Sequence, residues 1–215
     1  MESNICIIWD WNGTLLDDTS ACVGALNEML AARGRAPLTL EYFRENFAFP
    51  ARQFYEKIGM KVVDSEWDAL AWEYHERYLR QPSIRLNAEA VAALGRVQSL
   101  GWRQVMLSAL HQRLLEDELA RHEIRRYFDH VFGSDNYDGG SKLAQAETLM
   151  RTLRAEEKGA VPCRYVLIGD SLHDREIAQS LGVDCVLVST GGHSYARLAA
   201  VQRTATSLLA AFDLI

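Results

Sequence analysis

Proline and cysteine are scarce in this chain of 215 residues, which contains four of each. The sequence has no proline-rich or Gly/Ser-rich stretch, so it lacks the flexible linker that joins domains in series. It also lacks internal repeats and low-complexity segments. A chain of this length forms one domain of ordinary size, or a core domain with a smaller insertion. We therefore expect any second domain to be inserted within the first.

The cysteine positions exclude the common structural zinc sites. The four residues are Cys6, Cys22, Cys163 and Cys185. They form no CxxC pair and no Cys/His cluster with zinc-ligand spacing. Most fall in or beside apolar segments, where a buried free thiol is the ordinary state. This pattern indicates a reducing compartment, and we expect the cytoplasm.

Excess basic charge and long apolar runs are also missing. The net charge is −6, so the chain has no basic field to hold nucleic acid or an anionic membrane. No apolar segment approaches the roughly 18 residues that cross a bilayer, and the first residues do not follow the signal-peptide pattern. We expect a small-molecule partner, and either a monomer or a homodimer.

The first strand signal is the apolar run at residues 5–9, which ends in a polar turn. A helical pattern follows, with Thr19 or Ser20 as its expected cap and Gly34 at its end. Further helical patterns rich in aromatic residues span 39–48, 51–59 and 65–81, and no strand is predicted between them. We therefore expect residues 16–86 to form a helical cap domain.

Strand and helix patterns alternate in the remainder of the chain. The expected helix that begins this part is capped by Asn87 and closed by Gly101. The strand segments are continuous apolar runs, which is typical of a parallel sheet covered on both faces. We expect a doubly wound α/β core, made of residues 1–15 and 87–215, with strand order 3-2-1-4-5. The further strands are expected at 103–109, 130–135, 164–170 and 184–190, with helices at 111–124, 141–157, 173–182, 193–201 and 207–215.

Polar residues follow several of these strands at the point where each ends. Asp10, Ser108 and Asp170 come after the first, second and fourth strands, and Lys142 begins the helix after the third. Active sites of such sheets lie at the carboxyl ends of the strands. We therefore expect these four distant positions, together with Asp174, to converge.

Several carboxylates at one sheet edge repel each other unless a positive group lies between them. Mg²⁺ suits a site made of carboxylates, water and substrate phosphate, and Lys142 would neutralise further charge. Ser108 and the backbone amides of Gly13 and Thr14 are candidate donors to phosphate oxygens. A carboxylate such as Asp10 can attack phosphorus and form an aspartyl-phosphate. Taken singly, each residue has an ordinary structural role as a turn, cap or solvated side chain.

Four segments, DWNGTL, MLSA, GSK and GDSLHD, resemble in order the motifs of the haloacid dehalogenase-like hydrolases. The resemblance covers essentially the whole chain and is strongest toward phosphoglycolate phosphatase-like members with a helical C1 cap. It implies that Asp10 is the nucleophile and a metal ligand. The implied Mg²⁺ ligands are Asp10, the Asn12 carbonyl, Asp170 and Asp174. The implied phosphate-binding residues are Gly13, Thr14, Ser108, Ala109 and Lys142, and the implied catalytic residues are Asp10, Asn12, Ser108 and Lys142.

Asn12 departs from the family pattern, because phosphatases of this family usually carry Asp there as the general acid and base. An amide has no proton to exchange near neutral pH, and losing acid–base help typically costs roughly 10²–10⁴ in rate. The expected function is Mg²⁺-dependent hydrolysis of a small phosphorylated metabolite. A phosphate-binding module with slow turnover, or a phosphonate hydrolase that uses a cap lysine, remains as an alternative. A dehalogenase is disfavoured, because it needs no metal, whereas the acids of GDSLHD predict a metal site.

Several other residues are weaker candidates for a part in the site. His173 and His193 rank above His75 and His111 as substitute bases, and Lys57 or Lys61 would serve a phosphonate hydrolase. Asp17 and Asp18 are expected to cap a helix more than to contact substrate, and Arg52 is expected in solvent. The aromatic residues Trp67, Trp72, Tyr74 and Tyr78 are expected in the core of the cap or in its contact with the sheet domain.

Overall fold

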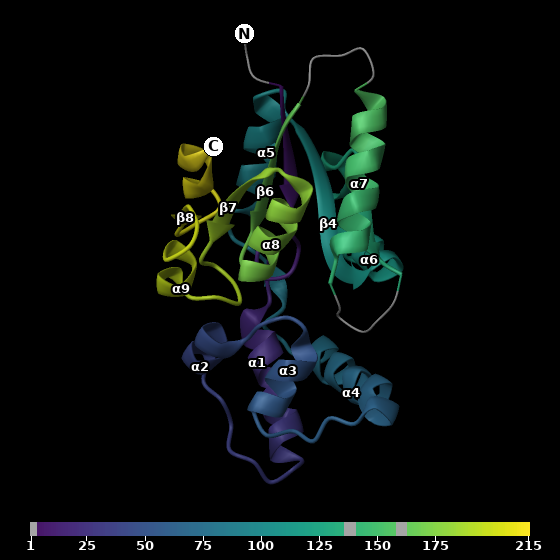
Figure 1. Cartoon of the computed structure of the whole chain (residues 1–215), viewed down its shortest axis with the longest axis vertical. Helices are drawn as coiled ribbons and strands as arrows, with labels where there is room; N and C mark the ends of the chain where they lie inside the picture. The colour runs from purple at the N-terminus through teal and green to yellow at the C-terminus, as the bar shows by residue number, and fades with distance from the viewer. Residues whose placement is uncertain (1–3, 136–140, 158–162) are drawn as a thin grey trace.

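A six-stranded parallel sheet forms the centre of the computed structural model, which describes residues 4–135, 141–157 and 163–215 (Figure 1). The strand order is β5-β4-β1-β6-β7-β8, and every neighbouring pair is parallel. This confirms the expected order 3-2-1-4-5 and adds one edge strand. The strands are β1 Ile5–Trp9, β4 Arg103–His111, β5 Val131–Ser134, β6 Arg164–Gly169, β7 Asp184–Val188 and β8 Thr204–Ala205.

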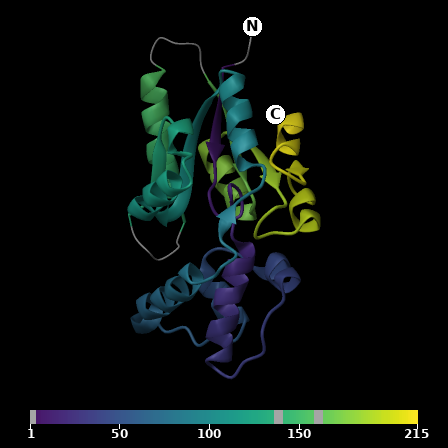
Figure 2. The ribbon, with the colours of Figure 1, turned by 180° about the vertical axis from the view of Figure 1, so that it is seen from behind.

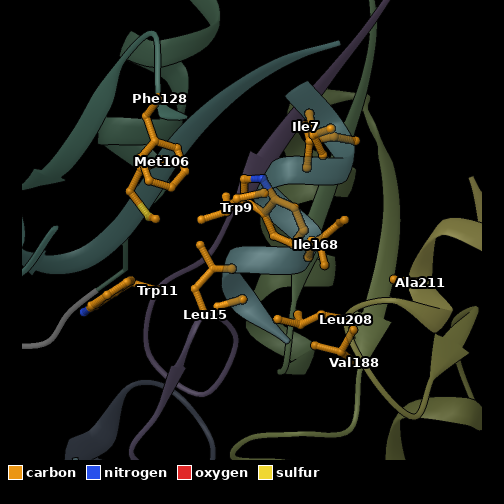
Figure 3. Close-up of a cluster of buried hydrophobic side chains, with 14 of the residues drawn as sticks. Ile7, Trp9, Trp11, Leu15, Met106, Phe128, Ile168, Val188, Leu208 and Ala211 are labelled. Atoms are coloured by element: carbon orange, nitrogen blue, oxygen red, sulfur yellow. The ribbon is translucent and has the colours of Figure 1, made fainter. Parts of the chain in front are cut away.

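Helices cover both faces of the sheet, which explains why the strands are apolar on both sides. Along β1, Ile7 and Trp9 point into one core, whereas Cys6 and Ile8 point into the other. Figure 3 shows the first core, where Trp9 packs between strands and helix. This core is covered by α5 Ala90–Ser99, α6 Gln112–Arg121 and the short η3 Ala210–Leu214, and the second by α7 Leu143–Glu156, α8 Leu172–Leu181 and α9 Tyr195–Ala199.

The segment between β1 and α5 is helical and lies at the end of the sheet where the strands finish (Figures 1 and 2). It has its own apolar core, in which Leu26, Met29 and Phe54 are buried. The division into domains at 15/16 and 86/87 remains a prediction. The segment contains α1 Thr19–Ala31, α2 Leu40–Asn46, α3 Ala51–Lys57, η1 Asp64–Glu66 and α4 Trp67–Leu79.

Two short strands close this segment, although none was expected there. β2 Leu16–Asp17 pairs antiparallel with β3 Arg85–Leu86. Each has two residues, too few to show a period-two pattern. Their pairing joins the outgoing and returning chain beside the sheet.

Helix starts and the C-terminal region also differ from expectation. α1 is preceded by Asp18, not capped by Thr19 or Ser20. α5 begins after Glu89, two residues later than expected, and Asn87 accepts from the Glu89 N–H while its amide donates to the Thr14 carbonyl. The expected helix at 207–215 is a short 3-10 turn, and β8 precedes it. Within the described residues, no helix is long and apolar enough to cross a membrane.

Candidate active site

Asp10 lies directly after β1, at the edge where the parallel strands end. Its backbone N–H donates to the carbonyl oxygen of Ile168 at 2.9 Å, which extends the sheet pairing by one residue. Its buried carboxylate accepts a hydrogen bond from Thr14 Oγ1 at 3.1 Å. The strand and the following turn therefore hold this carboxylate in one position.

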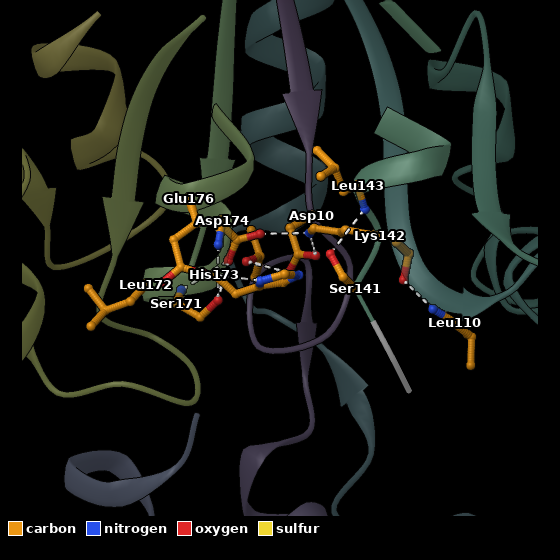
Figure 4. Close-up of polar contacts among 12 residues, drawn as sticks. Asp10, Leu110, Ser141, Lys142, Leu143, Ser171, Leu172, His173, Asp174 and Glu176 are labelled. Atoms are coloured by element: carbon orange, nitrogen blue, oxygen red, sulfur yellow. Dashed lines mark hydrogen bonds and ion pairs between the residues drawn. The ribbon is translucent and has the colours of Figure 1, made fainter. Parts of the chain in front are cut away.

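Lys142 joins two acids that are far apart in the sequence (Figure 4). Its Nζ lies 2.5 Å from Asp10 Oδ1 and 2.6 Å from Asp174 Oδ1. All three side chains are buried. Asp174 also accepts from the backbone N–H and the hydroxyl of Ser171, as part of the capping box that begins α8.

Burial and charge act against each other on these groups. Burial favours the neutral amine of Lys142, but Asp10 and Asp174 outweigh it and raise its pKa. Burial, reinforced by Asp174 and opposed by Lys142, raises the pKa of Asp10 to about 7. For Asp174, the burial penalty is outweighed by Lys142 and Ser171, so its pKa is lowered. The lysine therefore stabilises the ionised form of Asp174 more fully than that of Asp10.

Asp170 lies in a close-fitting niche of backbone. The N–H of Gly192 donates to its carboxylate. A Cβ atom on Gly13 or Gly191 would lie 2.3 or 2.1 Å from Asp170 Oδ2, and Gly13 also has a φ of +75°. Side chains at these two glycines would displace the carboxylate.

The acids of this edge fit a divalent cation. Asp10, Asp170 and Asp174 each offer an oxygen, and these oxygens lie within 4.8 Å of one another. Burial, together with the charges of Asp10 and Asp174, raises the pKa of Asp170 well above its usual range. Asp170 has no Lys or Arg ion-pair partner within the described ranges, so a bound cation would relieve this repulsion. Hard oxygen donors of this kind suit Mg²⁺.

Asn12 contacts an acid that was expected to be a helix cap. Its Nδ2 donates to Asp18 Oδ2 at 2.7 Å, and Tyr78 donates to the same oxygen at 2.7 Å. Asp18 Oδ1 accepts from the N–H of Gly13 at 2.8 Å. Asp18 makes no capping bond to α1, so that expectation was wrong. Asp17 instead pairs with Arg85 across β2 and β3.

The expected phosphate-binding residues differ in which of their hydrogen-bonding groups are already engaged. Ser108 and Ala109 line the cavity described below, although the Ser108 hydroxyl already accepts from Leu110 N–H at 3.0 Å. The N–H of Gly13 donates to Asp18 and that of Thr14 to the Trp11 carbonyl. Neither amide is therefore available to a phosphate in this arrangement. Gly140, the first residue of the GSK motif, lies outside the described residues.

A cavity of about 220 Å³ separates these acids from the helical segment. Its floor includes Asp10, Lys142 and Asp170. Its roof is mostly aromatic. From the sequence, the aromatic residues of the cap were expected only in its own core or in its contact with the sheet domain. Trp72 is instead 61% exposed. The roof includes Phe47, Phe49, Tyr55, Trp67, Tyr74 and Tyr78.

His193 has both ring nitrogens engaged. Nδ1 accepts from Leu172 N–H at 3.0 Å, and Nε2 lies 2.9 Å from the carbonyl of Phe47, to which it donates. Burial, with the nearby charge of Arg197, lowers its pKa to about 4. His193 therefore connects the sheet domain to the loop after α2 and has no lone pair left to act as a base.

The other histidines are placed differently. His173 lines the cavity, with its ring 4.8 Å from that of Phe49, and His75 lines it from α4. His111 precedes α6 and accepts from Arg113 N–H. Of the four, His173 and His75 reach the cavity.

The cap cations named from the sequence lie away from this cavity. Neither Lys57 nor Lys61 lines it. Arg52 forms ion pairs with Asp64 and Glu56. The geometry therefore disfavours a cap lysine as the catalytic group.

Comparison with known proteins identifies relatives across nearly the whole chain. Phosphoglycolate phosphatase of Caulobacter vibrioides is 28% identical over 192 residues, covering 86% of this chain and 79% of its own. The enzyme of the same name from Pseudomonas putida is 24% identical, covering 86% and 69%. A haloacid dehalogenase-like family hydrolase from Streptococcus pneumoniae has a similar fold, with a TM-score of 0.77 at 18% identity and coverage of 100% and 99%.

The match to a family model extends through the strands that carry the site. The model described as haloacid dehalogenase-like hydrolase matches residues 7–188, a range that includes Asp10, Lys142, Asp170 and Asp174. The chain belongs to the haloacid dehalogenase-like hydrolase family.

Proposed function

We propose that this protein hydrolyses phosphomonoesters of a small metabolite, with Mg²⁺, through an aspartyl-phosphate on Asp10. The observation that carries the proposal is the position of Asp10, which is buried at a strand end, 2.5 Å from Lys142 and beside Asp170 and Asp174. Phosphatase relatives support the reaction class. Free thiols at all four cysteines fit a reducing location, for which we take the cytoplasm.

In the first step, an Asp10 oxygen attacks phosphorus while the bond to the leaving oxygen breaks. Lys142 neutralises the nucleophile before the attack and would follow the negative charge onto the phosphoryl oxygens afterwards. In the second step, water attacks phosphorus, which restores the Asp10 carboxylate and releases inorganic phosphate. Asp170 and Asp174, with Asp10 and the Asn12 carbonyl, would hold Mg²⁺, which when bound stabilises charge on the phosphoryl oxygens.

Asn12 affects the proton transfers and not the attack. An amide donates no proton to a leaving alkoxide and removes none from water. The expected consequence is slow turnover of esters with poor leaving groups, by roughly 10²–10⁴ relative to a family member with Asp there. The amide at Asn12 also favours a second candidate function, a protein that binds phosphorylated ligands and hydrolyses them poorly.

A burst experiment separates these two candidates. An activated aryl phosphate is mixed rapidly with enzyme at high concentration, with and without Mg²⁺, and phenol release is followed. Steady Mg²⁺-dependent turnover supports the enzyme, whereas one product per protein followed by a stall supports the binding module.

Asp10→Asn is the matched control for that experiment, because it keeps the shape of the side chain but removes the nucleophile. We expect complete loss of both burst and turnover, with an unchanged circular dichroism spectrum. Product release by this variant would place the nucleophile on another residue.

A further inference from the structure

The roof of the cavity, which would face the organic part of a bound phosphomonoester, is mostly aromatic, and the acid Asp18 also lines the cavity. Tyr74 and Tyr78 of α4 stack with ring centroids 5.9 Å apart, and Tyr55 lies 5.8 Å from Trp67. The ring of Phe49, also in the roof, lies 4.8 Å from that of His173. A cavity wall made of flat side chains favours a flat ring packed against it.

The described lining of the cavity includes Lys142 and two histidines, His75 and His173, but no other Lys or Arg. Lys142 already pairs with Asp10 and Asp174. Arg44 and Arg197 lie at the boundary with the helical segment, but they donate to backbone carbonyls. A carboxylate on the organic part, as in phosphoglycolate, would therefore be buried without a Lys or Arg partner from the described lining.

Asn12 selects for the same kind of substrate by a separate route. When the Asp10 oxygen bonds to phosphorus, the leaving oxygen takes the electron pair of the broken bond. A phenol has a pKa of about 10, so it leaves as phenolate and takes its proton from water later. An aliphatic alkoxide, whose acid resembles water with a pKa of about 16, needs the proton that Asn12 cannot supply.

The size of the cavity sets the scale of the organic group. A closed apolar cavity of roughly 150 Å³ accommodates one benzene ring. At about 220 Å³, this cavity has room for one ring together with part of a phosphoryl group.

We propose that the substrate is a monoaryl phosphate, the phosphate ester of a small phenol without a further negative charge. This inference rests on the proposed phosphatase function and adds the substrate class. It differs from the substrate named in the relatives, because the roof of the cavity and Asn12 both favour an uncharged aromatic leaving group.

The test compares kcat/KM for four compounds with Mg²⁺. Phenyl phosphate is the expected good substrate. Cyclohexyl phosphate has similar size but leaves as an alkoxide, and phosphoglycolate carries the carboxylate. We expect phenyl phosphate to exceed cyclohexyl phosphate by at least about 100-fold and phosphoglycolate by at least about 30-fold. Acetyl phosphate, small and activated, reports on the phosphatase reaction without a ring.

A variant of the cavity wall checks the charge argument. Ala71 lines the cavity from α4, so Ala71→Arg would place a cation there, whereas Ala71→Gln adds length without charge. We expect Ala71→Arg to shift the ratio of phosphoglycolate to phenyl phosphate upward by at least about tenfold relative to Ala71→Gln. Thermal unfolding of both variants shows whether each is folded.

The outcomes separate the two levels of the proposal. If acetyl phosphate is hydrolysed but phosphoglycolate equals or exceeds phenyl phosphate, the substrate class is overturned and the phosphatase function stands. If none of the four is hydrolysed, the phosphatase function fails, and the substrate class fails with it. An equal ratio in the two Ala71 variants would contradict the role of charge in the cavity.

Discussion

At the scale of single residues, Asn12 is informative because of its partner. Its amide donates to Asp18, and Tyr78 donates to the same oxygen. Burial raises the pKa of Asp18, against the hydrogen bonds from Asn12 and Tyr78. An amide at residue 12 and a carboxylate at residue 18 therefore lie side by side in the site.

This pairing predicts how an acid at position 12 would behave. Asn12→Asp alone sets two carboxylates at about the 2.7 Å separation that now joins amide and acid, so one must be protonated or displaced. The exchanged variant Asn12→Asp with Asp18→Asn restores the hydrogen bond. We expect the exchanged variant to raise kcat for cyclohexyl phosphate by roughly 10² or more. The single variant should gain less and unfold at a lower temperature.

Steady-state kinetics and thermal unfolding of both variants test this prediction. Asp18→Asn alone is the control for loss of the native acid. If the exchanged variant shows no gain on cyclohexyl phosphate, a group other than residue 12 already supplies the proton.

At the scale of elements, strand ends and the turns beyond them form the site. Asp10 follows β1, Asp170 follows β6, and Gly191 lies in the turn after β7. Parallel strands bring these turns to one edge. The backbone of the last turn then approaches Asp170 so closely that a side chain at Gly191 has no space.

Gly191→Ala should therefore weaken cation binding, and it should also lower stability, because its Cβ would lie 2.5 Å from the Gly13 carbonyl oxygen. Its Cβ would lie 2.1 Å from Asp170 Oδ2, and moving a ligand or its support typically costs 10–100-fold in metal affinity. Gly95→Ala, in α5 with open space around it, is the matched control and should stabilise the helix by about 1 kcal/mol. Isothermal titration measures the Mg²⁺ affinity of both variants, and thermal unfolding measures their stability. An unchanged Mg²⁺ affinity in Gly191→Ala would contradict a metal role for Asp170.

At the scale of the whole molecule, the helical segment is attached to the sheet domain through the loop after α2. The Phe47 carbonyl accepts from His193 Nε2 at 2.9 Å and from Arg197 at 2.7 Å. Arg44 of α2 donates to the Gly191 carbonyl at 3.0 Å. These contacts hold the aromatic roof over the acids.

His193 makes this attachment sensitive to pH. Its pKa is lowered to about 4 when folded, whereas an unfolded chain titrates near 6.5. The unfolded state therefore binds a proton first as pH falls, and stability present above pH 6.5 is lost between 6.5 and 4. From pH 7 to pH 5, the free energy of unfolding should fall by about 2 kcal/mol through His193.

Urea unfolding of the native protein and of His193→Gln at pH 7 and pH 5 measures this contribution. The raised pKa of Asp10 acts in both proteins, so the difference between them isolates His193. We expect the advantage of the native protein to shrink by about 2 kcal/mol on going to pH 5. Parallel pH profiles would show that His193 does not change protonation on unfolding.

The sheet and most of the residues at its edge could be predicted from sequence patterns alone. Continuous apolar runs such as residues 5–9 and 165–169 predict parallel strands, and parallel strands end at one edge. Asp10 and Asp170 meet there for that reason. Lys142 and Asp174 reach the same edge because they lie at the starts of α7 and α8, the helices that follow β5 and β6. A repeating backbone geometry makes these positions predictable.

Tertiary packing decided the rest. Three features depend on how the helices of the inserted segment pack against the sheet. They are the pairing of Asn12 with Asp18 and Tyr78, the hydrogen bond from His193 to the Phe47 carbonyl, and the aromatic roof. Helical periodicity shows that a residue lies on an apolar face, but not whether that face meets a core or a cavity. The same holds for Trp67, which lines the cavity, and Trp72, which is exposed five residues later. That choice follows from the packing of whole elements, which no short pattern encodes.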